Sequence, residues 1–113
     1  MAAKSIDLDH LARYTGGEKQ LNAEILQLFD GQIASMVGEL DGLIASGDAK
    51  RWREVAHTIK GAARGVGAFP MGEAAAKAEP VNPANPGEAK AAIRILEQEA
   101  RTVHDFIQSY LAA

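Results

Sequence analysis

One stretch of sequence decides the fold of this chain most clearly, WREVAHTIKGAARGV at residues 52–66. Each residue of an α-helix turns by about 100° around the helix axis. On such a helix His57 lies nearly opposite the apolar side chains and is therefore expected to face water. The apolar side chains gather on one stripe, which is predicted to face the core: Trp52, Val55, Ala56, Ile59, Ala63 and Val66.

The predicted water-facing side of this helix carries little bulk and several positive charges. An exposed imidazole in such surroundings suits a nucleophile that another macromolecule must reach. The residues that share this side with His57 are Lys60, Gly61, Arg64, Arg53 and, in line one turn beyond Arg64, Ala68.

Helical periodicity, caps and breakers extend along the whole sequence, and no strand-like alternation of apolar and polar residues is present. We therefore predict an all-α fold, in which an antiparallel four-helix bundle carries an additional short N-terminal helix at one end. Residues 1–113 are expected to form a single domain. The predicted helices run from a cap at Ser5 or Asp7 to Tyr14, from Glu18 to just before Gly47, from a cap at Asp48 to about Gly67, from Phe69 to about Glu79, and from about Glu88 to Leu111.

The long second helix carries two patterns. Its apolar stripe is predicted to be Leu21, Ile25, Leu28, Phe29, Met36, Leu40 and Leu43. A second stripe is made of small residues: Gly31, Ser35, Gly38 and Gly42. Glycine has a low helix propensity, so the presence of three glycines in one helix requires an explanation. Close packing of another helix and a smooth docking surface beside His57 both explain them, and the sequence leaves the two readings open.

Composition excludes several classes of function. The net charge of −3 argues against general nucleic-acid binding, and the absence of cysteine excludes disulfides and thiolate metal sites. No Gly-rich loop follows a strand, so nucleotide binding is not expected. No apolar run approaches the length of a membrane span or a signal peptide, which makes the cytoplasm the expected compartment. His10 and His104 lack partners at metal-ligand spacing and are predicted to be surface or boundary residues.

The residues around His57 resemble the signature of histidine-containing phosphotransfer (HPt) domains. That signature is a histidine, an apolar residue, Lys-Gly, and a Gly-Ala pair seven residues beyond the lysine. It is matched here by His57, Ile59, Lys60, Gly61, Gly67 and Ala68. The stretch from Met71 to Glu79 is similar to the next helix of the family. This chain departs from the pattern at Ala62 and Ala63, where many relatives have Ser or Thr.

The resemblance implies a phosphorelay protein that is a phosphotransfer intermediate rather than a conventional enzyme. His57 would accept a phosphoryl group from an aspartate of one receiver domain and donate it to another, supported by Lys60, Gly61 and Arg64. The implied partners are receiver domains of response regulators and hybrid histidine kinases. No cofactor is expected on this chain, because the Mg²⁺ would sit in the acidic pocket of the receiver. A monomer is expected.

Two other functions fit parts of the pattern. A non-catalytic helical adaptor could bind a receiver or kinase, although the intact His57 and Lys60-Gly61 argue against it. The dimerisation domain of a kinase usually has an acidic residue after its histidine and a proline nearby, whereas Thr58 follows here and the helix has no proline. Gly61 is itself open to two readings, clearance for a partner or packing against a neighbouring helix.

Overall fold

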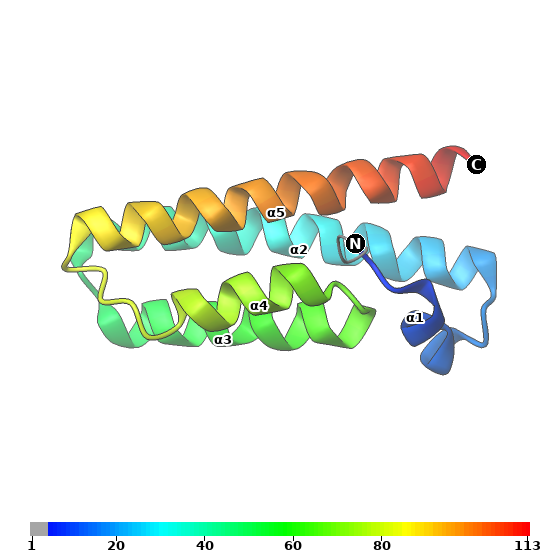
Figure 1. Ribbon diagram of the computed structural model, residues 1–113, viewed down its shortest axis with the longest axis horizontal. Helices are drawn as coiled ribbons and strands as arrows, with labels where there is room; N and C mark the ends of the chain where they lie inside the picture. The colour runs from blue at the N-terminus through cyan, green and yellow to red at the C-terminus, as the bar shows by residue number, and fades with distance from the viewer. Residues whose placement is uncertain (1–4) are drawn as a thin grey trace.

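The computed structural model describes residues 5–113, and every regular element within that range is an α-helix (Figure 1). The predicted all-α architecture is confirmed. The helices are α1 (Leu8–Thr15), α2 (Lys19–Ser46), α3 (Ala49–Val66), α4 (Phe69–Ala78) and α5 (Pro86–Ala112).

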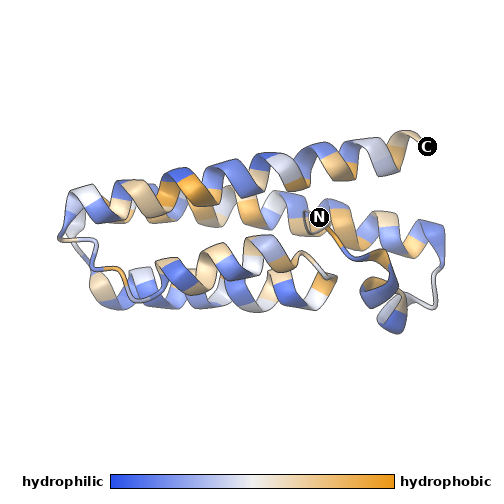
Figure 2. Cartoon of the chain, viewed as in Figure 1, coloured by the Kyte–Doolittle hydropathy of each residue, from blue (hydrophilic) through white to orange (hydrophobic). Residues whose placement is uncertain are grey.

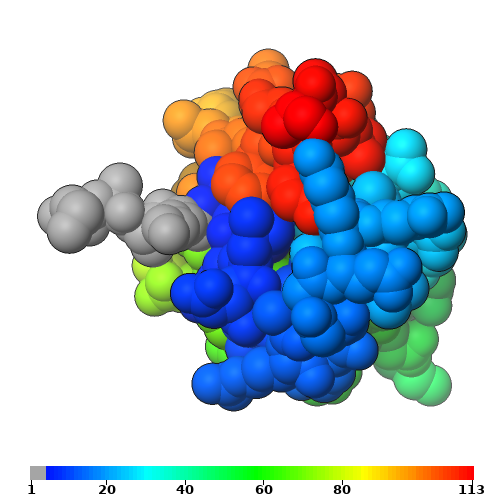
Figure 3. Space-filling view, turned by 90° about the vertical axis from the view of Figure 1, so that its right-hand side faces the viewer, coloured from blue at the N-terminus to red at the C-terminus, as the bar shows by residue number. Residues whose placement is uncertain are grey.

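Four helices form an antiparallel bundle in which each packs against two neighbours. α2 contacts α3 and α5, and α4 contacts the same two helices from the other side. The long α2 and α5 extend beyond the ends of α3 and α4, and α1 lies in the space that this leaves (Figure 1). Figure 3 looks at this end of the bundle, where the blue residues of α1 cover it. The short N-terminal helix therefore caps one end, as predicted.

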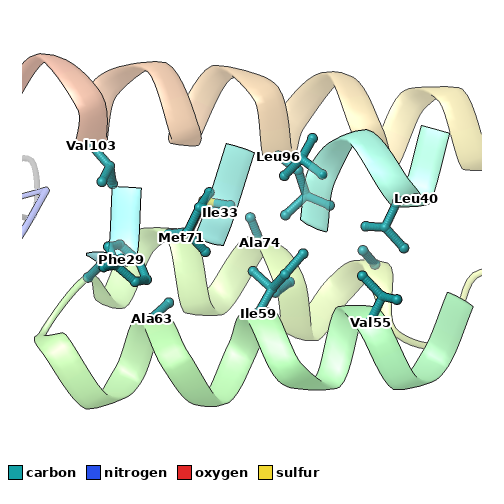
Figure 4. Close-up of a cluster of buried hydrophobic side chains, with 14 of the residues drawn as sticks. Phe29, Ile33, Leu40, Val55, Ile59, Ala63, Met71, Ala74, Leu96 and Val103 are labelled. Carbon is teal, nitrogen blue, oxygen red and sulfur yellow. The ribbon is translucent and has the colours of Figure 1, made fainter. Parts of the chain in front are cut away.

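Burial of apolar side chains between the helices holds the bundle together. Orange and blue segments alternate along each helix in Figure 2, as expected for amphipathic helices. On α3 the predicted core stripe is buried from Trp52 to Ala63, while Val66 is half-buried. The side chains in Figure 4 converge from the four helices of the bundle, among them Phe29, Ile33, Leu40, Val55, Ile59, Met71, Leu96 and Val103.

The ends of α3 are set by residues that suit them. The side chain of Asp48 accepts a hydrogen bond from the Arg51 backbone N–H at 3.0 Å, as an N-cap should. Gly67 ends the helix with φ of 89°, in the left-handed region. A Cβ at Gly67 would lie 2.6 Å from the Asp7 carbonyl oxygen, and the Asp7 N–H donates to the Gly67 carbonyl at 2.9 Å. Glycine at this position therefore joins α1 to the turn between α3 and α4.

Three details of the predicted elements are wrong. Ala68 was expected on the exposed side of His57, but α3 ends at Val66 and Ala68 is fully buried at the start of α4. Leu28 was expected in the core stripe of α2, but its surface is 69% exposed. The last helix begins two residues before Glu88, because the Asn85 side chain accepts from the Glu88 N–H and caps it. The buried residues of α2 are Asn22, Leu26, Phe29, Ile33, Val37 and Leu40.

Candidate phosphotransfer site

His57 lies in the middle of α3 and points away from the core. Its neighbours Ala56 and Ile59 are fully buried, whereas 68% of the His57 side chain is exposed. The predicted exposure of this histidine is confirmed. The position follows from helix geometry, because residues at the i and i+4 positions share a face and the core stripe occupies the opposite one.

Glu79 joins His57 to Lys60. His57 Nδ1 lies 3.1 Å from Glu79 Oε1, and Lys60 Nζ donates to Glu79 Oε2 at 2.7 Å. The glutamate is three-quarters covered and lies at the C-terminal end of α4, directly beside α3. The hydrogen bond from Lys60, helped by the one from His57, lowers the pKa of Glu79 and outweighs the opposing effect of burial. The carboxylate is therefore ionised at neutral pH.

Sequence reasoning missed Glu79 as a site residue. The signal that could have found it is the register of the hairpin formed by α3 and α4. Two antiparallel helices bring together residues equally far from their turn, and His57 and Glu79 are equally distant from Ala68. The same register pairs Arg64 with Gly72, where a Cβ would lie 3.0 Å from Arg64 Cγ. Gly72 thus allows the close approach of the two helices.

The predicted cations have different surroundings. Lys60 is mostly covered, with 22% of its side chain exposed, and its ammonium is held by Glu79. Arg64 and Arg53 are exposed, and within residues 5–113 neither forms an ion pair. The structure therefore brings Lys60 to the histidine through a shared carboxylate and leaves Arg64 and Arg53 facing solvent.

The glycines near His57 are open. Among the described residues, a Cβ placed on Gly61 or Gly65 would meet no atom within 4 Å, so the packing reading of Gly61 is wrong. The same holds for Gly31, Gly38 and Gly42 on α2, which excludes a helix-packing seam at these three glycines.

A groove between α2 and α3 adjoins the histidine. Thr58, the next residue after His57, lines it together with Leu28, Gly31, Ser35, Met36 and Ala62. The exposed Leu28 thus lies beside an open, weakly polar surface rather than in the core.

A second exposed histidine lies between α2 and α5. His104 Nδ1 is 2.8 Å from Asp30 Oδ2, and half of the His104 side chain is exposed. His10 is half-buried, with its ring edge-on to those of Tyr14 and Phe69. Both histidines lie at the surface or its boundary, as predicted.

Two further features are absent from the described residues, 5–113. They contain no group of three or more His, Cys, Asp or Glu side chains that could hold a metal ion. None of their helices is both long and apolar enough to cross a membrane.

A helical bundle that displays an exposed histidine beside a lysine and open glycines defines a class, the phosphotransfer domains that carry a phosphoryl group on histidine. The family model described as the Hpt domain matches residues 24–112. The chain therefore belongs to the Hpt domain family, and its role is histidine phosphotransfer in a phosphorelay. Domains of this family interact with receiver domains.

Among solved structures, histidine-containing phosphotransfer protein B (HptB) from Pseudomonas aeruginosa PAO1 has a similar fold. The two chains share 24% sequence identity over 99% of each, with a TM-score of 0.82. Because the match spans nearly the full length, it includes α1 as well as the four-helix bundle. Comparison with curated protein sequences gives no match.

Proposed function

We propose that His57 is the residue that carries the phosphoryl group. The observation that supports this most strongly is the exposed imidazole of His57, linked through Glu79 to Lys60 and next to the uncovered Gly61. A neutral imidazole nitrogen attacks the phosphorus of an aspartyl phosphate on a receiver. The N–P bond forms as the bond from phosphorus to the aspartate oxygen breaks, and the aspartate leaves as a carboxylate. The reverse step phosphorylates a second receiver.

The neighbouring residues have distinct proposed roles. A phosphorylated histidine carries added negative charge and strong acceptor oxygens, which Lys60 and Arg64 are placed to attract. Arg64 lies two turns along α3 from His57 and faces solvent, so it also attracts the acidic pocket of a receiver. Gly61 provides clearance for the loops of that partner, since a Cβ at this position would meet no atom of residues 5–113 within 4 Å.

The groove between α2 and α3 is the proposed docking surface for the receiver. It includes Thr58, the residue after the histidine, and is also lined by the exposed Leu28 and by Gly31. Interfaces need an apolar centre that excludes water, and a large exposed side chain on a smooth surface suits this. The specific proposed partners are receiver domains of response regulators and hybrid histidine kinases. Mg²⁺ belongs to their acidic pocket, and we propose no cofactor on this chain.

The assembly and compartment are also proposals. A single HPt domain spanning residues 1–113 would work as a monomer, because one chain completes the four-helix bundle. The proposed compartment is the cytoplasm, as expected from the sequence. Size measured in solution tests the monomer directly. An obligate dimer would favour a kinase dimerisation domain instead.

Phosphotransfer profiling tests the proposed function. The purified chain is mixed with a set of phosphorylated receivers, and the label on each protein is followed over time. We expect rapid loss of label from at least one receiver to this chain, and no loss to the His57→Gln variant. A chain that binds receivers but takes no label would be the non-catalytic adaptor.

A further inference from the structure

We propose that Arg53 and Arg64, which lie on either side of His57 along α3, bind carboxylates on the docking face of a receiver. This protein would then select receivers that carry acidic side chains around the phosphorylated aspartate, in addition to those of the Mg²⁺ pocket. The inference rests on the proposed function of His57 and deepens it. It adds the chemistry of the partner surface and the two side chains that recognise it.

Charge is distributed unevenly between the two halves of the bundle. Residues 49–79 form α3, α4 and the turn between them, and they contain six Lys or Arg and three Glu, a net charge of +3. The whole chain has a net charge of −3, so the remaining residues carry −6. The negative total therefore conceals a positive hairpin, and this hairpin is the part of the molecule that presents His57.

Ion pairs within the protein occupy most of the acidic groups near this hairpin. Arg51 binds both Glu54 and Glu39, and Lys60 binds Glu79. Within residues 5–113, Arg53 and Arg64 form no ion pair, and both side chains are exposed. These two guanidinium groups are therefore available to carboxylates of another molecule.

The two arginines bracket the histidine on one side of the helix. Arg53 precedes His57 by four residues and Arg64 follows it by seven, so at 1.5 Å per residue they lie about 6 Å and about 10 Å away along the axis. The stem of Arg64 lies against α4, because a Cβ at Gly72 would be 3.0 Å from Arg64 Cγ. A span of about 16 Å is much wider than a phosphoryl group. The pair is therefore suited to the loops that surround a receiver's aspartate.

The rest of the proposed docking surface opposes this positive charge with no acidic side chain. The groove between α2 and α3 is lined by uncharged residues, namely Gln27, Leu28, Gly31, Gln32, Ser35, Met36, Thr58 and Ala62. Asp30 and Asp41 of α2 line the other groove, beside α5. A receiver seated next to His57 thus meets guanidinium groups, which bind carboxylates through two parallel hydrogen bonds. Exposed charges of this kind act mainly on the rate of association and on the choice of partner.

The salt dependence of transfer tests the inference. The donor is the phosphorylated receiver that loses its label fastest in the profiling experiment, and the second-order rate constant is measured at about 0.1 M and about 1 M salt. The screening length falls from about 10 Å to about 3 Å over this range. Arg53→Gln combined with Arg64→Gln should slow transfer about tenfold at the lower salt concentration, and the difference from the natural protein should nearly vanish at the higher one.

A matched control removes the same charge from the opposite half of the bundle. Lys90 and Arg94 of α5 are exposed and form no ion pair within residues 5–113, so Lys90→Gln combined with Arg94→Gln gives the same net charge. This control should transfer like the natural protein at both salt concentrations. If the two double variants behave alike, the inference is wrong.

Folding is checked by circular dichroism and thermal melting, which should change little because Gln and Arg have similar helix propensities. If the double arginine variant is unfolded, Arg53→Gln and Arg64→Gln decide singly, each with an expected loss of about threefold at about 0.1 M salt. Unchanged rates in both single variants would also overturn the inference. Binding of duplex DNA by the natural protein, lost in the arginine variants, would assign these residues to a polyanion instead of a receiver.

The receiver provides the complementary change. Replacing the acidic side chains around its aspartate, outside the Mg²⁺ pocket, by their amides should slow transfer to the natural protein and have little further effect with the double arginine variant. Additive losses would contradict direct pairing. Labelling of the natural protein by phosphoramidate, a small donor without a docking face, tests the proposed function separately. A chain that takes this label on His57 but shows no dependence on the two arginines would contradict the present inference alone.

Discussion

His57 on α3 and His104 on α5 are both exposed, and each presents Nδ1 to a carboxylate of a neighbouring helix, at 3.1 Å from Glu79 and 2.8 Å from Asp30. Their surroundings differ. The Glu79 carboxylate is shared with Lys60, and a Cβ on Gly61, one turn away, would meet none of the described residues within 4 Å. The groove beside His104 is lined by Asp30, Asp41 and Glu97, with Arg101 as its one cation among the lining residues.

If His57 is the phosphoryl acceptor, as proposed, exposure and a carboxylate partner are not enough to define one. A phosphoryl group brings about −1.5 to −2 charges at neutral pH, which a surface rich in carboxylates disfavours. At His57 the nearby lysine offsets that charge, and an open surface leaves room for the donor. On this account the two histidines should respond very differently to the same chemistry.

The largest expected effect is the loss of the nucleophile. His57→Gln should abolish phosphoryl acceptance, while His104→Gln should accept at the rate of the natural protein. Both histidines are exposed, so helicity and the melting temperature should change little in either variant. Label transfer from a phosphorylated receiver measures the first effect and circular dichroism the second. Labelling that persists in His57→Gln would contradict the comparison, and loss of folding would contradict the exposed placement.

A smaller effect is expected from the cations. Lys60→Ala should slow transfer or shorten the lifetime of the phosphohistidine by about tenfold, the scale of one hydrogen bond to a charged group. Arg101→Ala, the matched change beside His104, should alter neither quantity. Transfer rates and hydrolysis of the isolated phosphorylated protein separate the two contributions. If both variants behave alike, Lys60 is an ordinary surface cation.

Steric clearance at Gly61 can be tested by one substitution that should raise stability and lower transfer. Gly61→Gln should stabilise α3 by about 0.5 kcal/mol, because Gln forms helices better than Gly and no atom of residues 5–113 lies within 4 Å of the added Cβ. The same change should weaken receiver docking and transfer. Gly38→Gln, beside the His104 groove, should stabilise α2 similarly and leave transfer unchanged. Full transfer by Gly61→Gln would show that the receiver does not approach this surface.

The smallest effect concerns pH. The hydrogen bond from Lys60 lowers the pKa of Glu79 in the folded protein below its ordinary value of 4.5. Its contribution to stability is therefore present above pH 4.5 and is lost as the pH falls through the lowered folded pKa. The melting temperature of the natural protein should exceed that of Glu79→Gln slightly at neutral pH, and the difference should vanish in acid. A difference that grows in acid would contradict this sign.

The local rules of helix formation predicted most of the fold. Asp48 and Gly67 have the chemistry of helix caps, and both end α3 where expected. Two residues were predicted on the wrong side: Ala68 at the surface and Leu28 in the core. Both errors have a physical explanation. Ala68 follows the turn at Gly67, so the helical wheel of α3 no longer applies to it. Leu28 has the apolar side chain typical of a core residue, but the bundle geometry turns it outward.

Only the part of the candidate site that depends on a single helix could be predicted from the sequence. The exposure of His57 depends on one helix, whose period is visible in the sequence. Glu79 comes from another helix, and its meeting with His57 and Lys60 depends on the tertiary register of α3 and α4. The openness of Gly61, and of Gly31 on α2, likewise depends on what neighbouring helices leave uncovered. Such contacts cannot be derived from the periodicity of a single element.

The central claim is that the phosphoryl group resides on His57, and locating it on the natural protein tests this most directly. The chain is labelled by a phosphorylated receiver, digested under conditions that preserve phosphohistidine, and sequenced by mass spectrometry. The account predicts a phosphoryl group on the peptide that contains His57, with peptides containing His10 and His104 unmodified. A phosphoryl group on His104 or His10, with His57 unmodified, would contradict the account.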